Sequence, residues 1–189
     1  MCIRDSAARG VTAVDLRVPL NAANATAPTY RRTDTHWNKL GALVAYNAVV
    51  RGAGKPDWMI DPARVLKGFE RVEGGDLARL LAVAGDVSDE DAVIDLSAYG
   101  SAPPPATPLA TQFESGGDLI ETGRAGPAVM VIGDSFTRVF WQDYFAAHAG
   151  RYMWMHHELC GFQRSVIDQN APQLVILAPA ERQMFCAGG

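Results

Sequence analysis

One short apolar run constrains the fold of this chain more than any other feature. Residues 128–132 read Ala-Val-Met-Val-Ile without a polar interruption. Runs of this kind are typical of strands that are buried on both faces of a largely parallel sheet. Gly-Asp-Ser-Phe follows at 133–136, and residues 137–148 are expected to form a helix. The succession of strand, tight turn and helix predicts an α/β fold.

The rest of the last third continues this alternation. Residues 151–156 and 174–178 are expected to form strands, and residues 162–169 a helix between them. Alternating strands and helices with apolar strands predict a three-layer α/β/α sandwich with a mainly parallel sheet. Because the chain has 189 residues and 48% hydrophobic content, we expect a single domain.

The first half is less regular. Residues 11–18 are rich in β-branched side chains and stop at Pro19, which predicts a strand followed by a polar loop over 21–32. Asn38 is a good N-cap for a helix in which apolar residues recur at helical spacing up to Gly52.

The middle of the chain carries weaker patterns. Asp76 is expected to cap a short helix in which Leu77, Leu80 and Leu81 share a face, and residues 92–96 to form a strand. Residues 100–127 are rich in proline and glycine and predict a connecting loop.

Composition excludes two classes of function. The formal charge is −4, and the basic residues form no run or stripe, so we expect no nucleic-acid partner. No stretch approaches the roughly 18 to 20 apolar residues that a transmembrane helix needs.

The three cysteines, Cys2, Cys160 and Cys186, lack CxxC spacing. A disulfide between Cys160 and Cys186 and free thiols both stay open.

Ser135 is the candidate nucleophile. It follows the buried strand, at the edge where open α/β sheets place their active sites. Backbone N–H groups at the start of the next helix point toward a developing oxyanion there, and the N–H of Ser135 itself is one expected donor. Gly133 is expected to permit the tight turn and close approach of substrate. The alternative is that Ser135 only caps the helix.

A serine nucleophile needs a base, and Thr-Asp-Thr-His-Trp at 33–37 supplies one. In an extended segment, residues two apart point to the same side, so Asp34 can orient His36. Trp37 is expected to wall the site or a sugar ring. The alternative is that Asp34 and His36 are ordinary polar loop residues.

Two other clusters compete with this triad. His156, His157, Glu158 and Cys160 resemble a metal site but lack the second histidine of a zincin motif, so no metal is predicted. Glu181-Arg182 follows the last predicted strand and either supports the site or forms a surface ion pair.

These blocks and their order resemble the SGNH hydrolase-like domain of the AlgX/AlgJ family of alginate O-acetyltransferases. The resemblance rests on Thr-Asp-Thr-His-Trp at 33–37 and Gly-Asp-Ser-Phe at 133–136, with weaker support at 75–81 and 172–182. It implies a catalytic triad of Ser135, His36 and Asp34 that moves an acetyl group through an acetyl-serine to a polysaccharide hydroxyl. It also implies a periplasmic protein without metal or diffusible cofactor. Its expected partners are a polysaccharide acceptor, an acetyl donor and other polysaccharide-synthesis proteins.

The resemblance also suggests a fragment, because family members carry a signal or anchor and further core elements before this point. Two rival functions stay open. A carbohydrate acetylesterase would use the same triad with water as acceptor, and a non-catalytic polysaccharide-binding scaffold would keep the fold without the chemistry.

Overall fold

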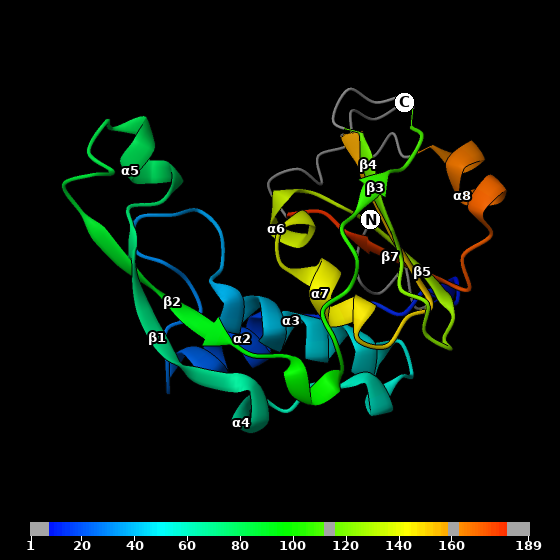
Figure 1. The fold of residues 1–189 in the computed structure, drawn as a ribbon, viewed down its shortest axis with the longest axis horizontal. Helices are drawn as coiled ribbons and strands as arrows, with labels where there is room; N and C mark the ends of the chain where they lie inside the picture. Colours follow the sequence, from blue (N-terminus) through cyan, green and yellow to red (C-terminus); the bar gives the residue numbers. More distant parts are fainter. Residues whose placement is uncertain (1–7, 112–115, 159–162, 181–189) are drawn as a thin grey trace. The chain divides into compact units, whose positions relative to one another are not determined.

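The structure is a computed structural model that describes residues 8–111, 116–158 and 163–180. It divides into two compact units, Met1–Ala98 and Tyr99–Gly189 (Figure 1). Each unit is described by itself below. The expectation of a single domain stays a prediction.

The second unit is built on a five-stranded mixed sheet. Its strand order is β3 (Thr107–Pro108), β4 (Gly117–Glu121), β6 (Arg151–His156), β5 (Ala128–Gly133) and β7 (Leu174–Ala178). β5 pairs in parallel with β6 and β7, as the sequence predicts, whereas β4 runs antiparallel to β6 and to β3. β3 and β4 lie inside the segment expected to be a loop, so that expectation was wrong for them. The α/β class is confirmed.

Alternating side chains of the central strands cover the two faces of this sheet. On one face Phe145 of α7 (Trp141–Ala146) stacks on Tyr152 of β6 at 5.8 Å between ring centroids. On the other, Met130 and Met153 pack in one cluster with Val166 of α8 (Arg164–Asn170). Helices therefore lie on both faces, and the second unit has three layers.

Two of the helices predicted for this unit differ in their bounds. The helix expected over 137–148 is divided into α6 (Ser135–Arg138) and α7, with Phe140 at the N-cap position of α7. The division brings Trp141 and Phe145, both fully buried, onto the sheet. The helix expected over 162–169 is α8 and ends one residue later.

The first unit is centred on α3 (Lys39–Gly52), which has the predicted bounds. Asn38 caps it, because its Oδ1 accepts the N–H of Gly41 at 2.9 Å while its Nδ2 donates to the carbonyl of Pro28 at 2.7 Å. The apolar face of α3, with Leu43 fully buried, makes the core of this unit.

A hairpin of β1 (Leu66–Glu73) and β2 (Ser88–Ile94) completes the unit, and α5 (Asp76–Leu80) lies in its connection (Figure 1). β2 confirms part of the predicted strand over 92–96. Short helices precede and follow the hairpin: η1 (Pro56–Trp58), α4 (Pro62–Val65) and η2 (Ser97–Tyr99).

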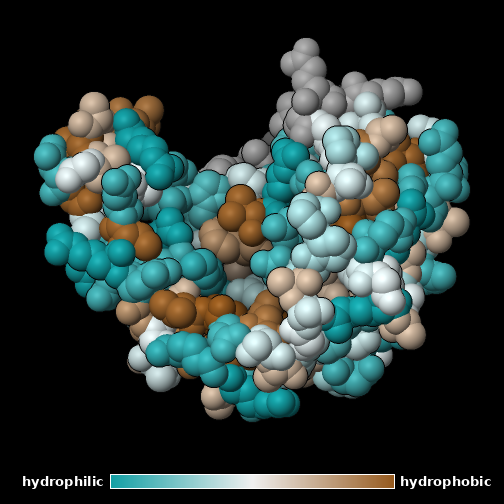
Figure 2. Space-filling model, viewed as in Figure 1, coloured by the Kyte–Doolittle hydropathy of each residue, from teal (hydrophilic) through white to brown (hydrophobic). Residues whose placement is uncertain are grey.

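The predicted helix α5 is present, but its expected cap is wrong. Gly75 occupies the N-cap position, and the carboxylate of Asp76 accepts hydrogen bonds from Thr35 instead. Leu80 is 82% exposed and Leu81 72% exposed, so the expected shared face does not pack into a core. Apolar surface among hydrophilic residues is visible at this end of the hairpin (Figure 2).

The strand expected over 11–18 is also wrong. Residues 11–16 have no regular structure, and α2 (Arg17–Asn24) occupies much of the expected loop. Asp15 accepts the backbone N–H of Arg17 at 3.0 Å, and Pro19 falls in the first helical turn, where a missing N–H costs nothing. Among the described residues, no helix is long and apolar enough to cross a bilayer.

We expect Asn38→Ala to lower the free energy of unfolding by about 1–3 kcal/mol, because it removes a cap and the bond from the buried Asn38 amide to the carbonyl of Pro28. Asn38→Asp keeps the cap but not that donor and is expected to fall between the two. Urea denaturation of the three proteins measures this. Equal stabilities of Asn38→Ala and the wild type would contradict the expectation.

Candidate functional site

The segment that carries Asp34 and His36 is closed at its base. Tyr30 and Trp37 form an antiparallel bridge, and the N–H of Asn38 donates to the carbonyl of Thr29 at 3.0 Å. We call residues 31–36 between these contacts the histidine loop. Since α3 begins at Lys39, the loop is attached to the longest described helix of the first unit. Trp37 is buried, and its expected part in walling the site stays a prediction.

Two buried carboxylates of β2 hold the first half of the histidine loop. Asp89 accepts the backbone N–H of Thr33 at 2.7 Å and its hydroxyl at 2.8 Å. Asp91, which is 1% exposed, forms an ion pair with Arg31 and accepts the N–H of Lys39 at 2.9 Å. Burial raises the pKa of Asp89, but the hydrogen bonds from Thr33 outweigh it, and the pKa lies below its usual range.

Asp34 and His36 lie together, in the contact that the spacing of two predicts. Asp34 Oδ1 lies 2.7 Å from His36 Nδ1 and also accepts the backbone N–H of His36 at 2.9 Å. Gly75 approaches Asp34 so closely that a Cβ there would lie 2.4 Å from the Asp34 carboxylate. Arg31 Nη1 lies 3.7 Å from Asp34 Oδ2 and adds positive charge behind the carboxylate. The pair is thus fixed in position, and its catalytic role stays a prediction.

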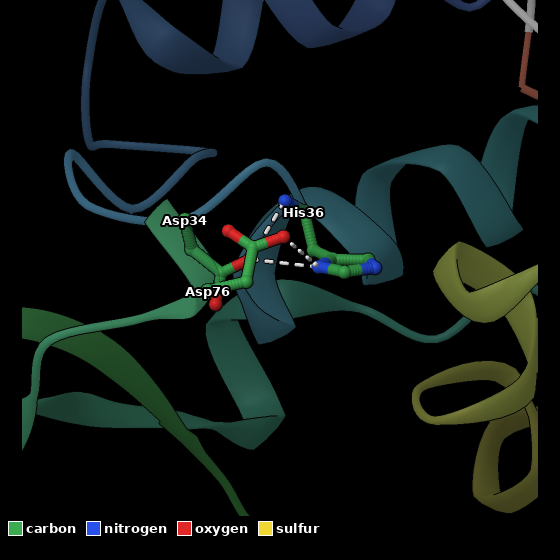
Figure 3. Close-up of side chains that lie close together, drawn as sticks. All are labelled: Asp34, His36 and Asp76. Atoms are coloured by element: carbon green, nitrogen blue, oxygen red, sulfur yellow. Dashed lines mark hydrogen bonds and ion pairs between the residues drawn. The ribbon is translucent and has the colours of Figure 1, made fainter. Parts of the chain in front are cut away.

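A second carboxylate, which sequence reasoning assigned to a helix cap, also faces the ring. Asp76 Oδ2 lies 3.7 Å from His36 Nδ1, and Figure 3 shows both carboxylates on the same side of the imidazole. Asp76 Oδ1 accepts the N–H of Thr35 at 2.7 Å, and its Oδ2 accepts the hydroxyl of Thr35. Desolvation raises the pKa of Asp76, but these bonds outweigh it and hold the pKa below its usual range.

Among the described residues, Asp34, His36 and Asp76 also form the one group whose spacing would suit a metal ion. One ligand atom from each of Asp34, His36 and Asp76 lies within 4.8 Å of the others. The shortest separation, 2.7 Å between Asp34 Oδ1 and His36 Nδ1, is that of a hydrogen bond. We therefore describe the cluster as a hydrogen-bonded network around the histidine and assign it no metal.

Ser135 lies at the turn that the sequence predicts. β5 ends at Gly133, and α6 begins at Ser135, which is exposed. Its expected alternative role as helix cap is filled by Asp134, whose Oδ1 accepts the N–H of Phe136 at 2.9 Å and whose Oδ2 accepts the N–H of Ala180 at 2.6 Å. Asp134 is 2% exposed, so the buried carboxylate fixes the turn from below and leaves Ser135 at the surface.

Gly133 is required by packing. A Cβ at this position would lie 2.2 Å from the hydroxyl of Thr137, which in turn accepts the indole N–H of Trp154 at 3.0 Å. Arg138 lies over the same indole at 4.7 Å and binds Asp118 of β4 with two bonds of 2.8 and 3.1 Å. These contacts hold α6 on the sheet. The expected role of Gly133 beside the substrate stays a prediction.

The competing histidine cluster has a different geometry from a metal site. His156 ends β6, and its ring stacks on that of His157 at 4.9 Å. His156 Nδ1 accepts the N–H of Glu158 at 3.0 Å, so this nitrogen carries no proton. Burial, together with the neighbouring His157, lowers the pKa of His156. Among the described residues, these side chains form no group of three possible ligands.

Several predicted contacts involve other parts of the chain. Cys2, Cys160, Cys186 and Glu181-Arg182 lie outside the described residues. Ser135 and His36 belong to different compact units, so their contact stays a prediction.

The three-layer unit, with an exposed serine between a buried strand and a helix, has the architecture of an SGNH hydrolase-like α/β domain. Residues 2–147 match the family described as the SGNH hydrolase-like domain of the acetyltransferase AlgX. Since this match spans most of the 189 residues, the chain belongs to that family.

Solved structures share the fold at low identity. A DHHW family protein from Eubacterium siraeum has a TM-score of 0.69 and 18% identity, over 98% of this chain and 70% of its own. The O-acetyltransferase domain of Pseudomonas putida AlgJ has a TM-score of 0.51 and 18% identity, over 93% and 62%. Bacillus cereus PatB1 with a sulfonyl adduct has a TM-score of 0.54 and 14% identity, over 82% and 61%. No curated protein sequence matches the chain.

The lowered pKa of Asp89 predicts how Asp89→Asn changes stability with pH. A carboxyl whose pKa is lower in the folded state stabilises the fold above its ordinary pKa of about 4 and loses this effect as pH falls through the lowered value. At pH 7 we expect Asp89→Asn to lower the free energy of unfolding by about 1–3 kcal/mol. The difference from wild type should narrow as the pH is lowered from 7 to below about 4.

Urea denaturation across this pH range measures the difference. Asp57→Asn is the control, because Asp57 is an exposed carboxylate of η1. It should follow the wild-type curve throughout. A difference between Asp89→Asn and wild type that stays constant down to pH 2 would contradict the expectation.

Proposed function

We propose that this chain is a serine O-acetyltransferase that acetylates hydroxyl groups of a polysaccharide. The observation that carries the proposal is the Asp34–His36 pair, with 2.7 Å between Oδ1 and Nδ1, in a loop held by buried carboxylates. Such a pair prepares the other ring nitrogen to accept a proton. Membership of the AlgX acetyltransferase family supports acyl transfer as its use.

In the proposed reaction His36 Nε2 accepts the proton of the Ser135 hydroxyl as the oxygen attacks the carbonyl carbon of an acetyl donor. Asp34 stabilises the imidazolium through Nδ1. The tetrahedral oxyanion is stabilised by backbone N–H groups at the start of α6, including that of Ser135. When it collapses, the donor's oxygen or sulfur leaves with the proton from His36, and Ser135 carries the acetyl ester.

In the second half-reaction, His36 accepts the proton of a sugar hydroxyl, whose oxygen attacks the acetyl-serine carbonyl. Collapse of the new tetrahedral species gives the sugar acetate, and His36 returns its proton to Ser135. Water as acceptor gives an esterase with the same residues. The family description names an acetyltransferase, which favours a sugar hydroxyl.

The finer parts of the proposal follow the family. An alginate-like exopolysaccharide is the proposed acceptor, and AlgJ, one of the similar structures, is described as an O-acetyltransferase domain. We propose a periplasmic location, with other polysaccharide-synthesis proteins as partners. Because the chain spans 62% of that AlgJ chain, the activity of a whole relative comes to it only as a proposal.

Ser135→Ala is expected to reduce turnover of a chromogenic acetyl ester by at least about 1,000-fold, because no other group in the proposed triad can carry the acetyl. An arylsulfonyl fluoride should label wild type once, and peptide mass spectrometry should place the label on Ser135. Ser165→Ala, an exposed serine on α8, is the matched control and should retain both activity and labelling. Unchanged turnover in Ser135→Ala would favour the non-catalytic scaffold.

Acetyl transfer and ester hydrolysis differ in the acceptor of the acetyl group, which is a sugar hydroxyl in the first and water in the second. We expect incubation of the wild type with an acetyl ester and a mannuronate oligosaccharide to give an oligosaccharide heavier by one acetyl group. The oligosaccharide should also accelerate release of the chromophore, because it competes with water for the acetyl-serine. Mass spectrometry of the oligosaccharide measures the first effect and absorbance the second. Acetate as the sole product would identify an esterase.

A further inference from the structure

The side of the His36 ring that faces Asp34 carries more negative charge than a triad needs. Asp34 Oδ1 already lies within hydrogen-bonding distance of His36 Nδ1, at 2.7 Å. Asp76 Oδ2 lies 3.7 Å from the same nitrogen, beyond a direct bond but well within electrostatic range. Figure 3 shows the second ring nitrogen pointing away from both carboxylates.

We propose that Asp76 is a positioning residue for His36, which stabilises the protonated ring and fixes the backbone that carries it. This inference rests on the proposed function for its catalytic consequence, although its physical basis lies wholly in the first unit. Asp76 acts through His36 and touches no reacting atom.

Two independent contacts support the proposal. The first is electrostatic: two carboxylates at Nδ1 favour the imidazolium that forms when His36 takes a proton. The second is mechanical, because Asp76 receives both the N–H and the hydroxyl of Thr35, the residue before the histidine. Asp76 remains charged near neutral pH, since its hydrogen bonds hold its pKa below the usual range despite some desolvation.

The charged groups that face this side of the ring in the described structure are Asp34, Asp76 and, behind Asp34, Arg31. Arg31 Nη1 lies 3.7 Å from Asp34 Oδ2, and Arg31 is also paired with Asp91. The guanidinium therefore offsets part of the charge of Asp34. Among the described residues, no ion pair joins Arg31 to Asp76.

Asp76→Asn tests the electrostatic part, because its amide oxygen can still accept the N–H of Thr35 while the charge and the acceptor for the Thr35 hydroxyl are lost. We expect the midpoint of the His36 ring titration, followed by NMR with a chelator present, to fall relative to that of wild type. The acidic limb of the pH profile of kcat/KM for an acetyl ester should move in the same direction. Thr35→Val keeps the charge and removes the hydroxyl, and should leave the midpoint near that of wild type.

Asp86→Asn is the matched control. It neutralises an exposed carboxylate in the same hairpin connection that carries α5. An unchanged midpoint in Asp76→Asn, or an equal fall in both variants, would overturn the proposal.

The ring titration needs no enzymatic activity, so it separates this inference from the proposed function. If Ser135→Ala leaves ester turnover unchanged but Asp76→Asn moves the His36 midpoint, the proposed function fails and the interaction of Asp76 with His36 stands. If Ser135→Ala abolishes turnover and the midpoint does not move, the assignment of Asp76 fails alone.

Discussion

The candidate site depends on carboxylates that hold a loop by its backbone. Asp89 and Asp76 accept the amide N–H and hydroxyl groups of Thr33 and Thr35, the two threonines that flank Asp34. A loop whose donors were left to water would sample many arrangements, and ordering it would cost conformational entropy. Because Asp89 and Asp76 bind these N–H and hydroxyl groups, the loop loses its conformational entropy when the protein folds. The bound donors and Asp34 therefore hold His36 in one orientation.

Folding of the hairpin and orientation of the histidine are consequently one process. Asp89 and Asp91 lie on β2, and Asp76 lies on α5 in the hairpin connection, far along the chain from the residues they hold. Gly75 packs against Asp34 where a side chain would collide. A change in the hairpin can thus alter the histidine without touching it. This linkage gives a physical reason for acidic residues in a hairpin that is otherwise largely exposed.

The sequence predicts those parts of the molecule whose structure is decided locally. The apolar run over 128–132 and the turn at Ser135 follow from burial and strand–helix punctuation, and both are present. The α3 cap at Asn38 is equally local. The prediction of a strand over 11–18 is wrong. The β-branched residues there favour a strand, but the turn at Asp15 and the position of Pro19 in a first helical turn override this preference. β4 has only five residues between glycine- and proline-rich segments, so its own sequence gives no clear strand pattern. It is a strand because its backbone pairs with β6.

Asp76 shows why the site could be predicted only in part. An aspartate at the start of a short helix is usually a cap, and the same residue becomes a partner of Thr35 only when the hairpin brings α5 to the histidine loop. The Asp34–His36 pair has a spacing of two and needs no tertiary information, whereas Asp76 is separated from Thr35 by 41 residues. A third member of a histidine network is therefore harder to recognise than the first two. In the structure Leu80 of α5 and the following Leu81 are exposed and Ala78 is the buried residue of α5, so the helix gains little from packing, and its aspartate binds another segment.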